Sequence, residues 1–162
     1  MQKKVLSVLV DNTSGVLSRI SGLFTRRGYN IDSISAGTAE DPRYSRITVV
    51  CQGDELELEQ IEHQVAKLED VRQITELKAG QSVCRELVLI KVKVAPEQRP
   101  SVVSVVDIFR ANIVDVEKDS MIIEMTGNQS KIDAFIRLLD GYEILEMVRT
   151  GLAGLTRGTS HE

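Results

Sequence analysis

A short polar stretch between an apolar strand and an amphipathic helix holds the residues that could bind a ligand. Residues 11–15 read Asp-Asn-Thr-Ser-Gly and follow the apolar run VLSVLV at 5–10. A helix is expected to begin directly after them, so that unpaired backbone N–H groups would point outward beside the positive end of the helix dipole. Gly15 would let a ligand approach the backbone, and Ser14 or Thr13 could cap the helix. Such a loop suits a carboxylate.

Asn12 extends this candidate from an anion site to a site for a free amino acid. Its amide oxygen could accept a hydrogen bond from an ammonium group while its NH₂ group donates. Val16 and Leu17 offer an apolar shelf at the start of the helix. Anion donors, a cation acceptor and an apolar pocket are the three parts that an α-amino acid needs. The alternative is a helix cap with a longer loop, and the residues alone leave both interpretations open.

Catalytic functions find little support in the sequence. Nucleophilic or acid–base catalysis needs a reactive group and a base within hydrogen-bond reach. The chain has two histidines, His63 within an acidic helical stretch and His161 in the terminal tail. No metal-binding residue stands four positions after His63, and no glycine-rich phosphate-binding pattern occurs. We therefore expect no active site and no metal site.

Nucleic-acid and membrane functions are also disfavoured. The formal net charge is −4, aromatic residues make up 4% of the chain, and the strands ITVVCQG and MIIEMTG carry none for bases to stack on. No apolar run is long enough to span a bilayer, and the first ten residues read as a strand rather than a signal peptide. Cys51 and Cys84 form no C-x-x-C pattern, which favours reduced thiols. We expect a cytoplasmic protein.

Hydrophobic periodicity organises the chain into two copies of one pattern. The first copy predicts a strand at 3–10, a helix from 16 to a C-terminal Gly28, a hairpin of 29–38 with 44–53, a helix at 54–68 and a strand at 71–78. The second predicts strands at 84–94, 112–119, 120–127 and 142–149 and helices at 99–110 and 128–141. This β-α-β-β-α-β order is the split βαβ of ferredoxin-like folds.

A gapless alignment of the two copies supports a duplication. Placing Gly53 on Gly127 puts Ile61 over Phe135. The expected fold class is α+β, with tandem ferredoxin-like βαββαβ domains and antiparallel sheets that carry their helices on one face. We assign residues 1–78 to the first domain, 79–83 to a linker, 84–158 to the second domain and 159–162 to a tail.

Such a fold leaves one sheet face and the edge strands uncovered. Because the strands are very apolar, an open edge is an aggregation liability, and pairing with a second copy removes it. We therefore expect a homodimer joined through sheet edges, in which Asn30 could reach a partner's loop. The terminal stretch TGLAGLTRG could be a flexible end or a docking segment. Ordered contact is favoured because Leu152 and Leu155 would otherwise be exposed.

Three stretches resemble the small, regulatory subunit of acetolactate synthase (acetohydroxyacid synthase). They are VLVDNTSGVLSRISGLFTRRGYNIDSIS, DPRYSRITVV and RTGLAGLTRG. The resemblance extends from the first strand to about Gly158. It implies an N-terminal ACT domain, which is the amino-acid-sensing version of the βαββαβ unit, followed by a second ACT-like domain.

The resemblance also implies a function. Members of this family have no catalysis of their own and no cofactor. They raise the activity of a separate large subunit, which carries thiamine diphosphate, Mg²⁺ and FAD, and they confer feedback inhibition by a branched-chain amino acid, usually valine. The effector site lies between the ACT domains of two small subunits. Carried over to this chain, it comprises Asn12, Ser14, Gly15 and Val16 of the loop and Asn30 and Ile31 of the facing chain. The alternative function is a stand-alone amino-acid sensor that acts on another protein.

Overall fold

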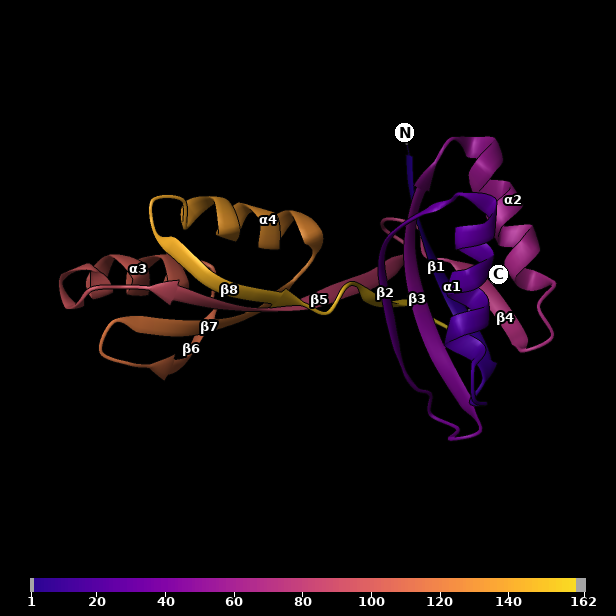
Figure 1. Cartoon of the computed structure of the whole chain (residues 1–162), viewed down its shortest axis with the longest axis horizontal. Coiled ribbons are helices and arrows are strands. Elements are labelled where there is room, and N and C mark those ends of the chain that lie inside the picture. The colour runs from indigo at the N-terminus through magenta and orange to yellow at the C-terminus, as the bar shows by residue number, and fades with distance from the viewer. Residues whose placement is uncertain (1, 160–162) are drawn as a thin grey trace. The chain divides into compact units, whose positions relative to one another are not determined.

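The computed structural model describes residues 2–159, which fold into two compact units. Residues 2–84 and 152–159 form the first unit, and residues 85–151 form the second. Each unit contains an antiparallel sheet with two helices on one face (Figure 1). The predicted α+β class and its tandem ferredoxin-like pattern are confirmed.

The first unit has the predicted order of elements. Its sheet has the strand order β2-β3-β1-β4. The elements are β1 (Gln2–Asp11), α1 (Val16–Arg27), β2 (Asn30–Thr38), β3 (Tyr44–Gly53), α2 (Glu55–Ala66) and β4 (Val71–Glu76).

Local signals in the sequence place the ends of the two helices. Gly28 adopts a left-handed conformation with φ 70°, and the Tyr29 N–H donates to the Phe24 carbonyl over 2.9 Å, which closes α1. Helix α2 begins with a capping box, in which the Asp54 carboxylate accepts from the Glu57 N–H over 2.8 Å and the Glu57 side chain accepts from the Asp54 N–H.

The core of the first unit lies between the sheet and its helices. Alternation along β1 and β3 sends every second residue toward α1 and α2, as the two-residue period of a strand requires. Burying a large apolar side chain contributes about 1.5–3 kcal/mol, so this layer supplies most of the favourable free energy of the unit. The fully buried members include Leu6, Val8, Ile20, Phe24, Ile47, Val49 and Ile61.

The second unit repeats this design with its own core. Its strands follow the order β6-β7-β5-β8. The rings of Phe109 and Phe135 meet edge to face with centroids 5.3 Å apart. The elements are β5 (Ser82–Lys93), the short η1 (Pro96–Gln98), α3 (Arg99–Ile108), β6 (Asn112–Val116), β7 (Ser120–Gly127), α4 (Gln129–Leu138) and β8 (Glu143–Arg149).

The boundaries of the units differ from the expected ones. The expected linker at 79–83 is a turn closed by the Gln81 N–H on the Lys78 carbonyl (3.1 Å), followed by the first residues of β5. Residues 152–158, which we had placed in the second domain, pack within the first unit. They include a further strand, β9 (Ala153–Thr156), which pairs with β5.

Strand β9 settles the interpretation of the terminal stretch in favour of ordered contact. Leu152 is 5% exposed, and Gly154 lies so close to Cys84 and Leu77 that a Cβ at this position would overlap both side chains. Leu155 is 62% exposed, so only one of the two leucines is covered. The strand lies near β3 and against the sheet face that carries no helices, so the chain itself covers part of the face that we expected to be open. No helix within residues 2–159 is long and apolar enough to cross a membrane.

Candidate functional site

Gly15 forms the junction between the polar loop and α1. It is the N-cap residue itself, with φ 84°, a conformation that glycine adopts without strain. No side chain caps this helix, so the expectation that Ser14 or Thr13 would do so is wrong. The reason is that Gly15, in its left-handed conformation, occupies the N-cap position itself, so Thr13 and Ser14 lie before the cap.

The start of α1 carries unused hydrogen-bond donors. Within residues 2–159, no acceptor meets the backbone N–H groups of Leu17 and Ser18, and the first turn has no acidic side chain. Helices α2 and α4 differ, because Asp54 and Asn128 cap them. The N-terminus of α1 therefore keeps both its donors and its positive dipole end for an external anion.

Asn12 holds the loop in place. Its backbone N–H donates to the Arg43 carbonyl (2.8 Å), and its Nδ2 donates to the Pro42 carbonyl (3.2 Å). Its Oδ1 accepts from the Ser45 hydroxyl at 3.0 Å. The oxygen that we expected to receive an ammonium group is thus already used inside the chain. One Nδ2 hydrogen and the second lone pair of Oδ1 remain for a ligand.

Two ion pairs that the sequence did not reveal fix the loop from the side of β4. Arg19 Nε lies 2.6 Å from Asp70 Oδ2, and the Thr13 hydroxyl shares the same carboxylate at 3.4 Å. Arg72 donates to both carboxylate oxygens of Asp11, at 2.7 and 2.6 Å. Arg19 could have been found from its position one helical turn after Gly15. Asp70 and Arg72 lie beside the loop because β1 pairs with β4. This pairing joins residues far apart in the sequence, so no local pattern predicts it.

These contacts balance the charges of the loop in two ion pairs. The hydrogen bonds from Arg72 hold the pKa of Asp11 below its ordinary 3.8, and those from Arg19 do the same for Asp70. Each carboxylate is therefore ionised and paired at neutral pH. The Arg19 guanidinium also lies 3.1 Å from the position of a Cβ on Gly15. A ligand carboxylate at the helix start would meet free N–H groups and a nearby cation.

The remaining predicted residues lie in two different places. Val16 is 8% exposed and belongs to the core, so the exposed apolar group beside the loop is Leu17, at 43%. Asn30 pairs with Gln52, whereas Asp11 pairs with Tyr44 at the other end of β3. Eight residues of strand separate these ends by roughly 27 Å. Ile31 packs against the core of the first unit. Within one chain, Asn30 and Ile31 do not meet the loop.

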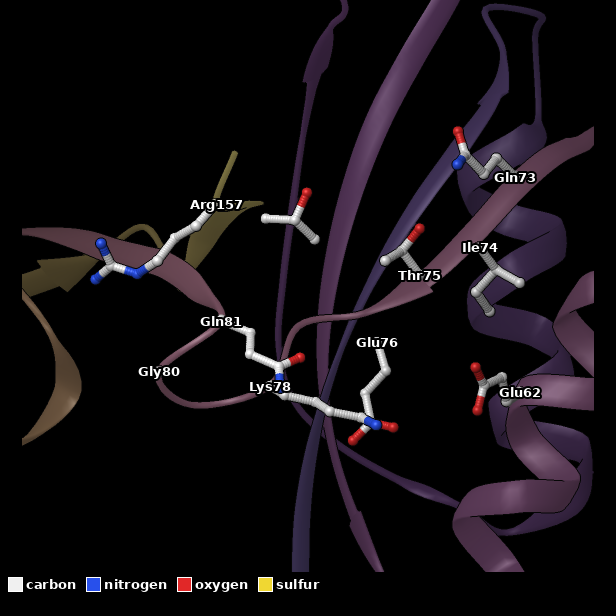
Figure 2. A pocket seen from close by; sticks show the side chains of 10 residues that line it. Glu62, Gln73, Ile74, Thr75, Glu76, Lys78, Gly80, Gln81 and Arg157 are labelled. Atoms are coloured by element: carbon white, nitrogen blue, oxygen red, sulfur yellow. The ribbon is translucent and has the colours of Figure 1, made fainter. Parts of the chain in front are cut away.

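A cavity of about 650 Å³ lies elsewhere in the first unit (Figure 2). Figure 2 shows Gln73 and Thr75 on one side of β4 and Ile74 on the other. Two of the residues that line the cavity are acidic, Glu62 and Glu76. Lys4 Nζ lies 3.0 Å from the Glu62 carboxylate and 3.7 Å from that of Glu76. None of the six predicted site residues lines this cavity, which is formed by Glu62, Gln73, Ile74, Thr75, Glu76, Lys78, Gly80, Gln81, Thr156 and Arg157.

Metal binding has no support among the described residues. Within residues 2–159, no three His, Cys, Asp or Glu side chains come together in a way that could hold a metal ion. His63 is exposed on α2, and His161 lies outside the described part of the chain. Cys51 and Cys84 are not joined in a disulfide within residues 2–159, and burial raises the pKa of the Cys51 thiol to about 11.

Known proteins match both units. The family described as "AHAS small subunit-like ACT domain" matches residues 6–73, and the family described as "Small subunit of acetolactate synthase" matches residues 85–158. A probable acetolactate synthase small subunit from Archaeoglobus fulgidus is 47% identical over 156 residues, which cover 96% of this chain and 98% of that protein. The chain belongs to the acetolactate synthase small-subunit family. The small subunit of acetolactate synthase isozyme 3 from Escherichia coli is 43% identical and covers 96% of both chains.

A solved structure agrees with this membership. The crystal structure of an acetolactate synthase small subunit from Thermotoga maritima has a TM-score of 0.90 and 39% identity, and the match covers 99% of this chain and 100% of that one. Residues 6–73 of the first unit thus form an ACT domain of the type found in this family. The matched C-terminal region runs through β9 and so includes residues that pack in the first unit.

Proposed function

We propose that this chain regulates acetolactate synthase by activating a catalytic large subunit and by making that subunit sensitive to valine. The observation that carries the proposal is the start of α1, where free N–H groups and Arg19 border a glycine junction on an ACT domain. Catalysis, with thiamine diphosphate, Mg²⁺ and FAD, is assigned to the large subunit, and no cofactor is assigned to this chain. The complex would work in the cytoplasm.

The proposed effector pose follows from the chemistry of the loop. The valine carboxylate would accept from the N–H groups of Leu17 and Ser18, beside Arg19. The isopropyl group would contact the exposed side chain of Leu17. The ammonium group needs an acceptor, and the best-placed one in this chain, Asn12 Oδ1, is already shared with Ser45. A further acceptor from a second chain would complete the site.

A homodimer supplies that acceptor. Strand β2 is an edge of the first sheet, and after the irregularity at Ile31–Ser33 its residues 33–38 include no charged residue and no Pro, so this part of the backbone can pair with another strand. A two-fold, antiparallel pairing of β2 strands would place Asn30 of one chain beside the Thr38 end of its partner. The loop lies at that end, because Asn12 bonds to residues of the β2–β3 turn. This arrangement would bring Asn30 and Ile31 of one protomer to the loop of the other.

A ligand at this seam could couple to catalysis. Because it would contact both protomers, its binding would favour one relative packing of the two. A coupling of about 1–3 kcal/mol is typical, and reciprocity then requires that the large subunit change the affinity for valine. Selection of valine over leucine would depend on pocket size, since one methylene contributes roughly 1–3 kcal/mol.

Reconstitution tests this function. Purified chain is mixed with the acetolactate synthase large subunit, and acetolactate production is measured with and without valine. We expect the chain to raise the rate and valine to reverse that increase. A chain that binds valine but leaves the large subunit unaffected would instead be a stand-alone amino-acid sensor.

A further inference from the structure

The helix-free face of the first sheet carries an ordered set of polar side chains. Cross-strand pairing aligns four hydroxyl residues, one from each strand, in a single row: Ser35, Thr48, Ser7 and Thr75. The adjacent row consists of Gly37, Arg46, Leu9 and Gln73. The hydroxyl row therefore runs beside a guanidinium group on a face that the family's effector loop does not use.

Arg46 is a half-buried cation without an ion-pair partner among residues 2–159. Its Nη1 donates to the Ser7 hydroxyl oxygen at 3.2 Å, and Ser7 is only 3% exposed. Within residues 2–159 no carboxylate forms an ion pair with Arg46, although Arg43 and Arg72 each have one. Partial burial of an unpaired charge is unfavourable, which makes Arg46 a strong binding group for an anion.

A cavity of about 400 Å³ opens over these residues. Strand β9 and the residues after it form one wall, so the cavity exists because the chain returns across this face. Its surface combines hydroxyl, amide and guanidinium groups with three leucines. The lining residues are Ser7, Leu9, Glu40, Arg46, Gln73, Thr75, Leu77, Leu155, Thr156 and Gly158.

We propose that this cavity binds a small aliphatic monocarboxylate. Arg46 would donate to the carboxylate through its planar guanidinium fork. Ser7 accepts from Arg46, so its own hydroxyl hydrogen is free to donate to the same ligand. Leu9, Leu77 and Leu155 would contact the aliphatic part.

The charge of Glu40 narrows the class of ligand. Glu40 is one of the residues that line the same cavity, and within residues 2–159 it forms no ion pair with Arg46, so a second negative charge on the ligand would be repelled. The site therefore favours one carboxylate and an uncharged tail. It shares no residue with the loop at 12–16, so it does not depend on the proposed effector site.

The test uses the full chain and 4-methylpentanoate, with 4-methylpentanamide as its uncharged counterpart. Binding is followed by isothermal titration and by amide chemical shifts of β1 and β4. We expect saturable binding of the acid and none of the amide. Arg46→Gln should weaken binding by at least about tenfold, because a charge-assisted pair is lost. Arg157→Gln, which alters a cation of the neighbouring cavity only, should leave it unchanged.

Further variants separate the possible results. Thr75→Val keeps the shape of the side chain and should weaken binding of the acid less than Arg46→Gln does. Unaltered thermal unfolding of both variants would show that they fold. Equal binding of the acid by Arg46→Gln and the unchanged chain would overturn the proposal. Loss of acid binding in Gly15→Asp would also overturn it, because the acid would then bind at the loop. If no acid binds but Arg46→Gln weakens association with the large subunit, the anion is a protein side chain and the small-ligand site is rejected.

Discussion

Arg19 Nε donates to Asp70 Oδ2 over 2.6 Å and ties the first turns of α1 to the residue before β4. The same guanidinium borders Gly15, and the Thr13 hydroxyl donates to the same Asp70 carboxylate. One ion pair therefore sets the position of the loop and of the cation beside it. The affinity for an anion at the start of α1 would therefore depend on Asp70, because Asp70 positions Arg19, although the anion would not contact Asp70.

Gly15→Asp is expected to abolish valine inhibition while activation of the large subunit is retained. The new carboxylate would occupy the place of the ligand carboxylate and pair with Arg19 instead. The measurement is acetolactate production against valine concentration. Gly15→Ala is the matched control, because it shares the left-handed backbone strain at φ 84° but adds no charge. Inhibition that survives in Gly15→Asp would refute the loop as the effector site.

Asn30→Ala is expected to weaken inhibition by about fivefold, the effect of one lost hydrogen bond. The fold should be intact, because the Asn30 side chain is exposed at the start of β2. Asn112→Ala provides the control, since Asn112 starts the corresponding strand, β6, of the second unit. If both variants respond to valine like the unchanged chain, Asn30 serves only as a strand residue.

Asp70→Asn should make the stability of the chain less dependent on acidic pH. The pKa of Asp70 is lower in the folded chain than its ordinary 3.8, because Arg19 donates to the carboxylate. Its charge therefore stabilises the fold at neutral pH, and this contribution is lost as the pH falls through the folded-state pKa, below about 4. Thermal unfolding from pH 7 to pH 3 should show a lower Tm for the variant at pH 7 and a shallower decline. Parallel curves would contradict the pairing.

Gly154→Ala is expected to displace β9. A Cβ at this position would lie 2.6 Å from Cys84 Sγ, 2.8 Å from Leu77 Cδ1 and 3.1 Å from the Val83 carbonyl oxygen. Limited trypsin digestion should then cleave after Arg157 faster than in the unchanged chain. Gly37→Ala, where a Cβ would meet no atom within 4 Å, should leave the rate unaltered. Equal rates for both variants would show that the contact can relax.

Arg149→Met should destabilise the second unit by about 3 kcal/mol, because it leaves the buried carboxylate of Glu86 without its partner. Asp133, which also contacts Arg149, is exposed enough to be solvated. Urea unfolding would measure the loss. The double variant Glu86→Leu/Arg149→Met should recover much of it, since no charge is then buried. A double variant less stable than Arg149→Met would argue against this interpretation.

Periodicity predicted the fold well because each long element is amphipathic. The hairpin strands β3 and β7 have the predicted bounds, 44–53 and 120–127, and burial alternates along β7, whereas residues 47–51 of β3 are all buried. Strand β9 has four residues, too few for a period, and its place is set by the fit of Gly154 against Cys84 and Leu77. Short elements of this kind are decided by tertiary contacts.

The candidate site was predicted only in part, for a related reason. Gly15 was found because a glycine before an amphipathic helix is a local signal. Val16 was predicted to contact the ligand, but its side chain is buried in the core of the first unit. Asp70 reaches the loop through strand register, which depends on residues far apart in the sequence. Sequence patterns therefore located the loop but not the side chains that support it.

The return of β9 to the first unit has a consequence for synthesis on the ribosome. The first unit is begun by residues 2–84 and completed by residues 152–159, with the whole of residues 85–151 made in between. A nascent chain would hold a complete ACT sheet whose helix-free face, with Leu77 and the hydroxyl row, lacks its cover until residues 152–158 have been made. Products truncated before β9 would carry this defect even where every residue of the loop at 11–15 is present.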